Sequence, residues 1–298
     1  MHSNTSSQPS TIQEIFVRTR NALMASGIND SDIEAEVLVR HLLSMDRSQY
    51  FASLSDIVTS ENSDKLNTFV KMRLAGEPLA YITGIREFYG LEFEVNRNVL
   101  IPRQETELLV DLALEYISNR EKNGQSLVST VADVCTGSGA VGVALAVNCP
   151  SARIYATDIS QAAIEVAKQN ALTHKVADRV SFVQNDLMDG VQDPYDLILS
   201  NPPYIPHGML DTLDIEVRNE PRIALDGGSD GLEIFRRLIE QSGTMLHGFG
   251  ALMVELMPEQ MDVALELARE TFPNAEVGYT EDLAGNARAL TVYSGGQI

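Results

Sequence analysis

Residues 129–142 read STVADVCTGSGAVG, an apolar run that leads into glycines at positions 137, 139 and 142. The run has the length and composition of a buried strand, and the glycines permit a tight turn at the start of the next helix. A ligand can approach the backbone closely at such a turn. We therefore predict that this stretch is the first strand and the nucleotide-binding turn of an α/β domain.

Two acidic residues follow later strands at the same predicted edge. Asp158 lies 21 residues after Gly137, where a carboxylate can accept hydrogen bonds from ribose hydroxyls. Asp186 follows the third strand, near the expected place of an adenine amino group, although a helix N-cap is an equally good interpretation. By spacing alone the motif fits both NAD and S-adenosylmethionine (SAM), and a glycine turn that only packs a helix on a strand is a third interpretation.

Strands and helices alternate regularly from residue 129 to the C-terminus. Strands are predicted near 129–135, 152–157, 180–184, 196–200, 250–255, 275–279 and 288–293, and helices near 140–148, 160–172, 230–247 and 258–271. This order predicts a doubly wound, mostly parallel sheet of seven strands.

The chain before residue 105 has a different pattern. Apolar residues recur at spacings of three and four from residue 11 to residue 74, which predicts a small helical bundle. Gly27 is expected to end its first helix, and Ser31 with Glu34 to form a capping box for the second. The period changes to two within residues 81–103, which predicts a β-hairpin. We therefore expect a helical domain at 1–78, a hairpin linker at 79–104 and the α/β domain at 105–298.

Composition limits the possible functions. The chain has 22 Lys and Arg against 42 Asp and Glu, a net charge of −20, and a surface of that sign repels nucleic acid and anionic lipid. Its two cysteines and five histidines show no metal-ligand spacing, so no metal site is predicted. Because no long apolar run or signal-like N-terminus is present, we expect a cytoplasmic protein without a membrane partner.

Asn201-Pro202-Pro203-Tyr204 follows the fourth strand directly, at the sheet edge where α/β proteins bind ligands. The prolines stiffen the loop and leave neighbouring carbonyls free to accept hydrogen bonds. The Asn201 side-chain oxygen and the Pro202 carbonyl can each accept one hydrogen of a planar NH₂ group, and Tyr204 can pack against that group or face a sulfonium. This chemistry favours a methyltransferase that acts on an amide or aryl amine, and Asn201, Pro202 and Tyr204 are its candidate catalytic residues.

Beyond this motif, the chain resembles the HemK/PrmC-type peptide chain release factor glutamine methyltransferases from about residue 11 onward. Similar segments are GEPLAYITG (76–84), EFYGL (87–91), VLIPRQETE (99–107), NEPRIALDGG (219–228), DGL (230–232) and DLAG (282–285). The resemblance implies a helical domain that docks the release factor and a SAM-dependent domain that methylates the glutamine of its Gly-Gly-Gln motif.

Together, the motifs and the resemblance give a set of candidate site residues. The candidate SAM-binding residues are Cys135, Thr136, Gly137, Ser138, Gly139, Asp158, Asp186, Leu187 and Asn201. The candidate substrate-binding residues are Asn201, Pro202, Pro203, Tyr204 and Phe88.

The chain departs from the family pattern at several positions. Cys135 stands where the family usually has glycine, and Leu187 stands where it often has an aromatic residue. We expect both changes to weaken SAM binding. Gln104 replaces a proline and residues 255–258 replace a Glu-Ile-Gly-type turn, changes expected to alter packing. The C-terminal Gly295-Gly296-Gln297 has the same sequence as the substrate motif that the resemblance implies, so the tail could enter the site as a weak pseudosubstrate. Chance occurrence of this tripeptide is the competing interpretation.

Other functions fit part of the pattern. An adenine amino methyltransferase would use similar chemistry on nucleic acid, but the net charge of −20 argues against it. A ribosomal-protein glutamine methyltransferase would have the same active site. An NAD-dependent oxidoreductase explains the glycine turn and leaves residues 201–204 without a role, and a non-catalytic scaffold predicts no SAM binding.

Overall fold

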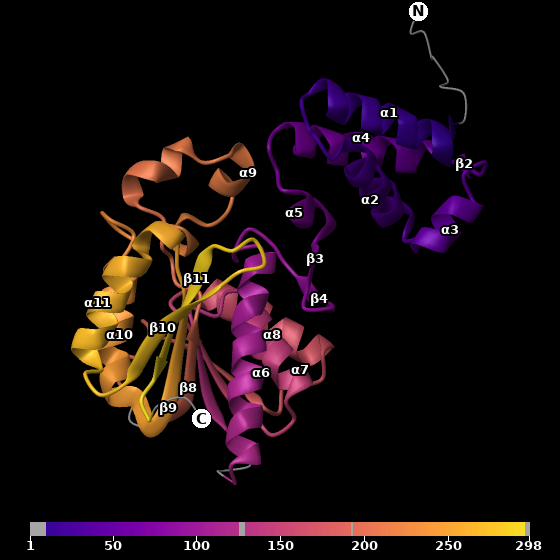
Figure 1. Cartoon of the computed structure of the whole chain (residues 1–298). Coiled ribbons are helices and arrows are strands. Elements are labelled where there is room, and N and C mark those ends of the chain that lie inside the picture. The colour runs from indigo at the N-terminus through magenta and orange to yellow at the C-terminus, as the bar shows by residue number, and fades with distance from the viewer. Residues whose placement is uncertain (1–9, 125–128, 192, 296–298) are drawn as a thin grey trace, which may run out of the picture. The chain divides into compact units, whose positions relative to one another are not determined.

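The computed structural model describes residues 10–124, 129–191 and 193–295 (Figure 1). The chain folds as two compact units, Met1–Gly84 and Ile85–Ile298. This boundary lies beyond the predicted residue 78 because Leu79–Thr83 form a short helix, α5, whose Ile82 packs into the helical core. Gln297 of the proposed pseudosubstrate tail lies outside the described residues. Within them, no helix combines the length and the apolar character that a membrane span needs.

The first unit is a helical bundle, as predicted. Besides α5, it contains α1 (Ile12–Ala25), α2 (Ser31–Leu43), α3 (Arg47–Ala52), α4 (Ser60–Leu74) and two short paired strands, β1 (Ser10–Thr11) and β2 (Ile57–Val58). Thr11 and Glu14 form a capping box at the start of α1, in which each side chain accepts a hydrogen bond from the other's backbone N–H. The capping box satisfies two backbone N–H groups and thereby fixes the N-terminus of α1.

The capping box predicted at Ser31 and Glu34 is wrong. The N-cap residue of α2 is Asp30, which makes no side-chain cap, and Ser31 is buried as the first helical residue. Glu34 instead accepts two hydrogen bonds from the Arg73 guanidinium of α4, at 2.6 and 2.9 Å. A bidentate pair with a nearly buried arginine is stronger than a local cap, and it joins two helices that are 39 residues apart.

The second unit contains the predicted seven-stranded sheet. Its strands are β5 (Thr130–Val134), β6 (Arg153–Asp158), β7 (Val180–Gln184), β8 (Tyr195–Ser200), β9 (Leu246–Glu255), β10 (Glu276–Glu281) and β11 (Ala287–Tyr293). The spatial order is β10-β11-β9-β8-β5-β6-β7, and β11 runs antiparallel to both of its neighbours. The predicted hairpin is also present, formed by β3 (Ile85–Phe88) and β4 (Leu91–Glu94).

Helices cover both faces of this sheet (Figure 1). The helices are α6 (Glu107–Lys122), α7 (Ala140–Asn148), α8 (Gln161–Thr173), α10 (Glu233–Met245) and α11 (Met261–Thr271). Alternate strand residues enter two separate cores: Val131, Leu197 and Leu199 pack with α6 and α7. Ala132, Val134 and Ile198 pack with α10 and α11. The two-residue period of a strand therefore produces the doubly wound architecture.

Short elements cover the carboxyl edge of the parallel strands. They are the 3₁₀ turns η1 (Gln104–Thr106), η2 (His207–Thr212), η3 (Arg222–Ala224) and η4 (Pro258–Gln260), with the helix α9 (Ile215–Arg218). These segments lie near the site described below.

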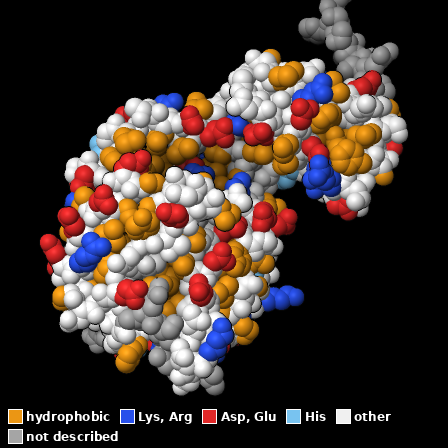
Figure 2. All heavy atoms as spheres, viewed as in Figure 1, with side chains coloured by type: hydrophobic (Ala, Val, Ile, Leu, Met, Phe, Trp, Pro, Cys, Tyr) orange, Lys and Arg blue, Asp and Glu red, His pale blue; other side chains and the backbone are white. Residues whose placement is uncertain are grey.

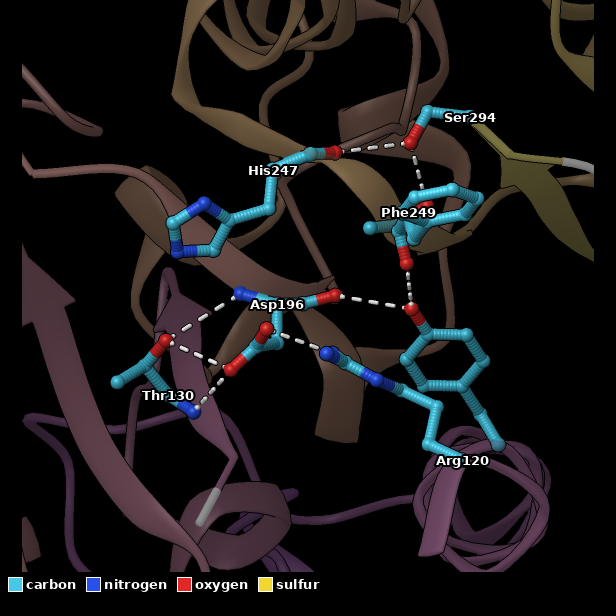
Figure 3. Close-up of polar contacts among 8 residues, drawn as sticks. Arg120, Thr130, Asp196, His247, Phe249 and Ser294 are labelled. Carbon is cyan, nitrogen blue, oxygen red and sulfur yellow. Dashed lines mark hydrogen bonds and ion pairs between the residues drawn. The ribbon is translucent and has the colours of Figure 1, made fainter. Parts of the chain in front are cut away.

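A polar network fastens the opposite edge of the sheet (Figure 3). Arg120 of α6 forms an ion pair with Asp196 of β8 at 2.6 Å, and both side chains are mostly buried. The Thr130 backbone N–H and hydroxyl donate to the same carboxylate, at 2.8 and 3.0 Å. Burial opposes ionisation of Asp196, but the hydrogen bonds from Thr130 and the ion pair with Arg120 outweigh it, so its pKa lies below the usual value. The network joins α6, β5 and β8.

Replacing Arg120 with methionine should leave the Asp196 charge buried without its ion pair. We expect Arg120→Met to lower the free energy of unfolding by about 3–5 kcal/mol, measured by chemical denaturation at pH 7. Lys168→Met, which breaks the exposed Lys168–Glu165 pair, is the matched control and should change it by no more than about 1 kcal/mol. Equal losses in the two variants would contradict a stabilising role for the buried pair.

Candidate active site

Two loops lie side by side at the carboxyl edge because β5 and β8 are paired in parallel. The Ser200 hydroxyl donates a 2.7 Å hydrogen bond to the Val134 carbonyl, so the last residues of the two strands are also joined by a side chain. Residues 135–139 and 201–204 begin directly after this bond. Parallel pairing therefore brings the predicted cofactor turn and the predicted substrate loop together.

A cavity of about 490 Å³ opens beside the glycine turn, a volume suited to a nucleotide-sized ligand. Its lining includes most of the predicted SAM-binding residues, namely Cys135, Thr136, Gly137, Ser138, Asp158, Asp186, Leu187 and Asn201, together with Pro203. Further walls come from residues 98–102 and 222–226, whose role was not predicted from the sequence.

Asp158 holds the glycine turn as well as lining the cavity. One carboxylate oxygen accepts from the Gly137 N–H and the other from the Ser160 N–H, both at 2.9 Å. Burial raises the pKa of Asp158, and these two backbone hydrogen bonds oppose the rise. Asp158 is therefore placed to organise the turn, and its position in the lining fits the predicted contact with ribose.

Asp133, which sequence reasoning missed, supports the same turn from inside β5. Its carboxylate accepts from the Thr136 hydroxyl at 2.6 Å and from the Gly142 N–H at 3.0 Å. Burial raises the pKa of Asp133 to about 6, although both hydrogen bonds lower it. An acidic residue inside an otherwise apolar strand was the signal that could have identified it.

The two departures that are expected to weaken SAM binding, Cys135 and Leu187, have unusual backbone conformations. Cys135 has a φ of +62° and Leu187 a φ of +54°, both in the left-handed region that favours glycine. This explains why glycine suits position 135. Burial raises the pKa of the Cys135 thiol, so this side chain lines the cavity as a neutral group.

Asp186 forms an ion pair in the wall of the larger cavity. Its carboxylate pairs with Arg237 of α10 at 2.7 Å, and both residues line the cavity. No described helix begins at Asp186, so the N-cap interpretation is wrong. An adenine amino group at this place would share the carboxylate with Arg237.

A second cavity, of about 240 Å³, is also lined by residues of the 201–204 loop. Its lining is mainly apolar and comprises Leu100, Arg103, Asn201, Tyr204, Ile205, Leu213, Val217, Ala224 and Leu225. Asn201 lines both cavities, and Pro203 lines only the larger one. Leu100 and Ala224 also line both cavities, so these three residues form the wall that the two cavities share.

The loop that carries Asn201 is tightly packed. A Cβ atom at Gly231, whose φ is +78°, would lie 2.2 Å from the Tyr204 carbonyl oxygen. One at Gly227 would lie 2.7 Å from Tyr204 Cα. The Gln260 side-chain amide donates to that same Tyr204 carbonyl at 2.8 Å. Glycine at 227 and 231 is thus required for the close approach of the two segments, which keeps the loop rigid.

Glu220 joins the two segments that wall both cavities. One of its buried carboxylate oxygens accepts from the Ile101 N–H at 2.9 Å, and the other pairs with the Arg103 guanidinium. The bond spans 119 residues of sequence. Residues 99–103 and 219–225 are therefore held as one wall.

Three predicted site residues lie away from the cavities. Phe88 is 1% exposed and packs edge-to-face on Phe93 in the core, so its placement in the substrate site is corrected. Gly139 packs against Ala167 of α8 and is absent from the lining of the larger cavity. Pro202 is buried and lines neither cavity with its ring. Its proposed contact with substrate is through the carbonyl.

Known proteins resemble the chain in both units. Residues 14–84 match the PrmC N-terminal domain and residues 111–219 the methyltransferase small domain. A protein of Rhodopirellula baltica named release factor glutamine methyltransferase is 37% identical over 287 residues, which cover 95% of this chain and 96% of that protein. A protein of Moorella thermoacetica with the same name is 37% identical over 284 residues, which cover 95% of this chain and 98% of that protein. The chain belongs to the release factor glutamine methyltransferase family.

This membership confirms the resemblance found in the sequence and, with the methyltransferase domain, SAM as the cofactor. The NAD-dependent oxidoreductase and the non-catalytic scaffold are thereby excluded. The cavity of about 490 Å³ fits such a cofactor in size, and Asp158 and Asp186 supply acceptors in its wall.

Solved structures share the fold at low sequence identity. The hMettl16 catalytic domain, solved in complex with the MAT2A 3'UTR hairpin 6, superposes with a TM-score of 0.53 at 16% identity, covering 81% of this chain and 85% of that one. Human methyltransferase 10 domain containing protein gives a TM-score of 0.50 at 17% identity, covering 69% and 89%. These likenesses confirm the methyltransferase architecture.

Asp158→Ala should weaken SAM binding, because it removes a charged acceptor and the partner of the Gly137 N–H. We expect the dissociation constant to rise by a factor of about 10–100, corresponding to roughly 1.5–3 kcal/mol. Asp158→Asn keeps one acceptor oxygen, so its dissociation constant for SAM should lie between those of Asp158→Ala and the wild type. Calorimetry checks this, with exposed Asp262→Ala as control. Unchanged affinity in folded Asp158→Ala would remove this residue from the site.

Proposed function

We propose that this protein transfers the methyl group of SAM to the side-chain amide nitrogen of the glutamine in the Gly-Gly-Gln motif of class I release factors. The position of Asn201 in the walls of both cavities supports this proposal most directly. The relatives named release factor glutamine methyltransferase support the substrate. Because release factors act in translation, we also propose a cytoplasmic location.

The residues of the loop would activate the acceptor by holding it. An amide nitrogen is a poor nucleophile because its lone pair is delocalised into the carbonyl group. The Asn201 side-chain oxygen and the Pro202 carbonyl would each accept one N–H, which favours a pyramidal nitrogen directed at the methyl group. Holding two reactants in this geometry contributes on the order of 7–11 kcal/mol.

The bound cofactor supplies a methyl group on a positively charged sulfur. Methylation would make the acceptor nitrogen acidic, and it would release one proton to water while the sulfur of the cofactor would leave as a neutral thioether. Tyr204 is not suited to act as a base, because burial and the neighbouring Glu255 raise the pKa of its phenol well above the usual value. The loop would therefore act by positioning the acceptor rather than by removing its proton.

Two related functions use the same chemistry. A ribosomal-protein glutamine methyltransferase would need no change in the site, and the names of the relatives favour release factors. An adenine amino methyltransferase would need a basic surface for nucleic acid, which a net charge of −20 does not favour.

The proposal is tested by incubating the protein with methyl-labelled SAM and one of three acceptors: a class I release factor, ribosomal proteins or nucleic acid. We expect the label on the release factor alone, and mass spectrometry should assign it to the Gly-Gly-Gln peptide. Label only on ribosomal protein or on adenine would replace the proposal with the corresponding alternative.

Asn201→Ala should lower kcat by a factor of about 10²–10³, because one positioned acceptor for the substrate amide is lost. The dissociation constant for SAM should stay within a few-fold of the wild-type value, since the cofactor cavity keeps its other walls. Steady-state kinetics and calorimetry measure the two quantities. Asn67→Ala, exposed on α4, is the matched control. Turnover near the wild-type rate would remove Asn201 from catalysis.

We further propose that the helical unit docks the release factor through a surface that we call the aromatic–arginine surface. Phe51 and Ile33 are 55% and 65% exposed there, and Arg47 lies over the Phe51 ring at 5.8 Å. Figure 2 shows hydrophobic side chains gathered beside basic ones on this unit. They border a hollow of about 410 Å³ that also includes Phe16 and Arg20. Exposed aromatic and arginine side chains are typical of binding hot spots.

Phe51→Ser should therefore raise KM for an intact release factor about tenfold, equivalent to about 1.4 kcal/mol. KM for a short Gly-Gly-Gln peptide should not change, because the peptide needs only the active site. Leu283→Ser, at an exposed position of the second unit, is the control. An unchanged KM for the intact protein would indicate that this surface does not dock it.

A further inference from the structure

Two polar side chains of α10 bind the loop of residues 185–189, which follows β7 and lines the larger cavity with its first three residues. One of them, Gln241, uses both ends of its amide. Its Oε1 accepts from the Met188 N–H at 3.0 Å, and its Nε2 donates to the Asp189 carboxylate at 2.6 Å. The loop backbone is therefore fastened to a helix that lies more than fifty residues away in the sequence.

The other side chain, Arg237, lies one helical turn before Gln241, so both are on the same face of α10. Its guanidinium donates to Oδ2 of Asp186 at 2.7 Å, and Arg237 and Asp186 both line the larger cavity. This bond uses one of the two carboxylate oxygens and leaves Oδ1 for a donor inside the cavity. The function proposed above gives Arg237 no role.

The ion pair contributes little to the stability of the fold. The side chains of Arg237 and Asp186 are 45% and 40% exposed, and ion pairs at such exposure are weak in water. A charge-assisted hydrogen bond nevertheless fixes the direction of a carboxylate that would otherwise rotate freely. Because Gln241 already fixes the backbone of the loop, the side-chain torsions of Asp186 are the freedom that Arg237 removes.

We propose that Arg237 is a positioning residue for the cofactor, which turns the Asp186 carboxylate so that its Oδ1 accepts the 6-amino group of adenine. Arg237 then contributes to the preference of the site for adenine over a purine without that group. This inference rests on the place proposed for the adenine amino group at Asp186. It does not depend on the identity of the methyl acceptor.

Calorimetry with two ligands measures this preference. One ligand is S-adenosylhomocysteine, and the other is its deamino analogue, in which hydrogen replaces the 6-amino group. We expect Arg237→Met to raise the dissociation constant for S-adenosylhomocysteine about five- to tenfold, because a preorganised hydrogen bond is lost. The dissociation constant for the deamino analogue should change by less than about twofold, since this ligand has no N–H to donate to Asp186.

Two further variants serve as rescue and control. Arg237→Lys keeps a charged donor, so its dissociation constant for S-adenosylhomocysteine should lie between those of Arg237→Met and the wild type. Arg269→Met removes an exposed arginine of α11 and should change the affinity for neither ligand. Chemical denaturation should show that each variant folds.

Asp186→Ala tests whether Arg237 acts through Asp186. It should remove the preference of the wild type for S-adenosylhomocysteine over the deamino analogue, and adding Arg237→Met should then change neither dissociation constant further. Equal weakening of both ligands in folded Arg237→Met would mean a general disturbance of the loop, and tighter binding of S-adenosylhomocysteine would mean that Arg237 competes with adenine for the carboxylate. Either result, or unchanged affinity, would overturn the inference. Because these measurements concern binding alone, a failure to methylate release factor would refute the proposed function and leave this inference standing.

Discussion

The hydrogen bond from the Ser200 hydroxyl to the Val134 carbonyl joins the two strand ends on which the site depends. Parallel pairing of β5 and β8 brings any two loops that follow them to one edge, and this bond sets their separation at the last residue. The glycine turn then faces one cavity and Asn201 faces two. The strand order therefore places the cofactor turn and the proposed acceptor loop at one edge of the sheet, as the proposed transfer between two ligands requires.

Distant segments provide the rigidity that a positioning mechanism needs. Glu220 holds residues 99–103 against 219–225, and Gly231 allows the backbone to reach within contact of Tyr204. The helices α10 and α11 cover this part of the sheet and give it an apolar base. In this chain, residues 201–204 are thus one part of a larger packed unit, and their prolines account for only part of the stiffness of the loop.

The sequence predicted the features that depend on local patterns. Alternation of apolar residues located all seven strands of the sheet, and the glycine turn and Asn201–Tyr204 were identified because each has a chemical signature within a few residues. Contacts between distant positions were not predictable in this way. Glu34 pairs with Arg73 rather than capping a helix, and Phe88 turns into the core. Thr106 and Asn201 meet across 95 residues, and no periodicity encodes that contact.

A crystal structure with S-adenosylhomocysteine and a Gly-Gly-Gln peptide would test the central claim most directly, that Asn201 stands between cofactor and acceptor. The account predicts the sulfur atom in the cavity of about 490 Å³ and the glutamine side chain in the narrower one. The glutamine nitrogen should donate to the Asn201 side-chain oxygen and point toward the sulfur. A glutamine bound elsewhere, or an Asn201 side chain directed only at the cofactor, would contradict the account.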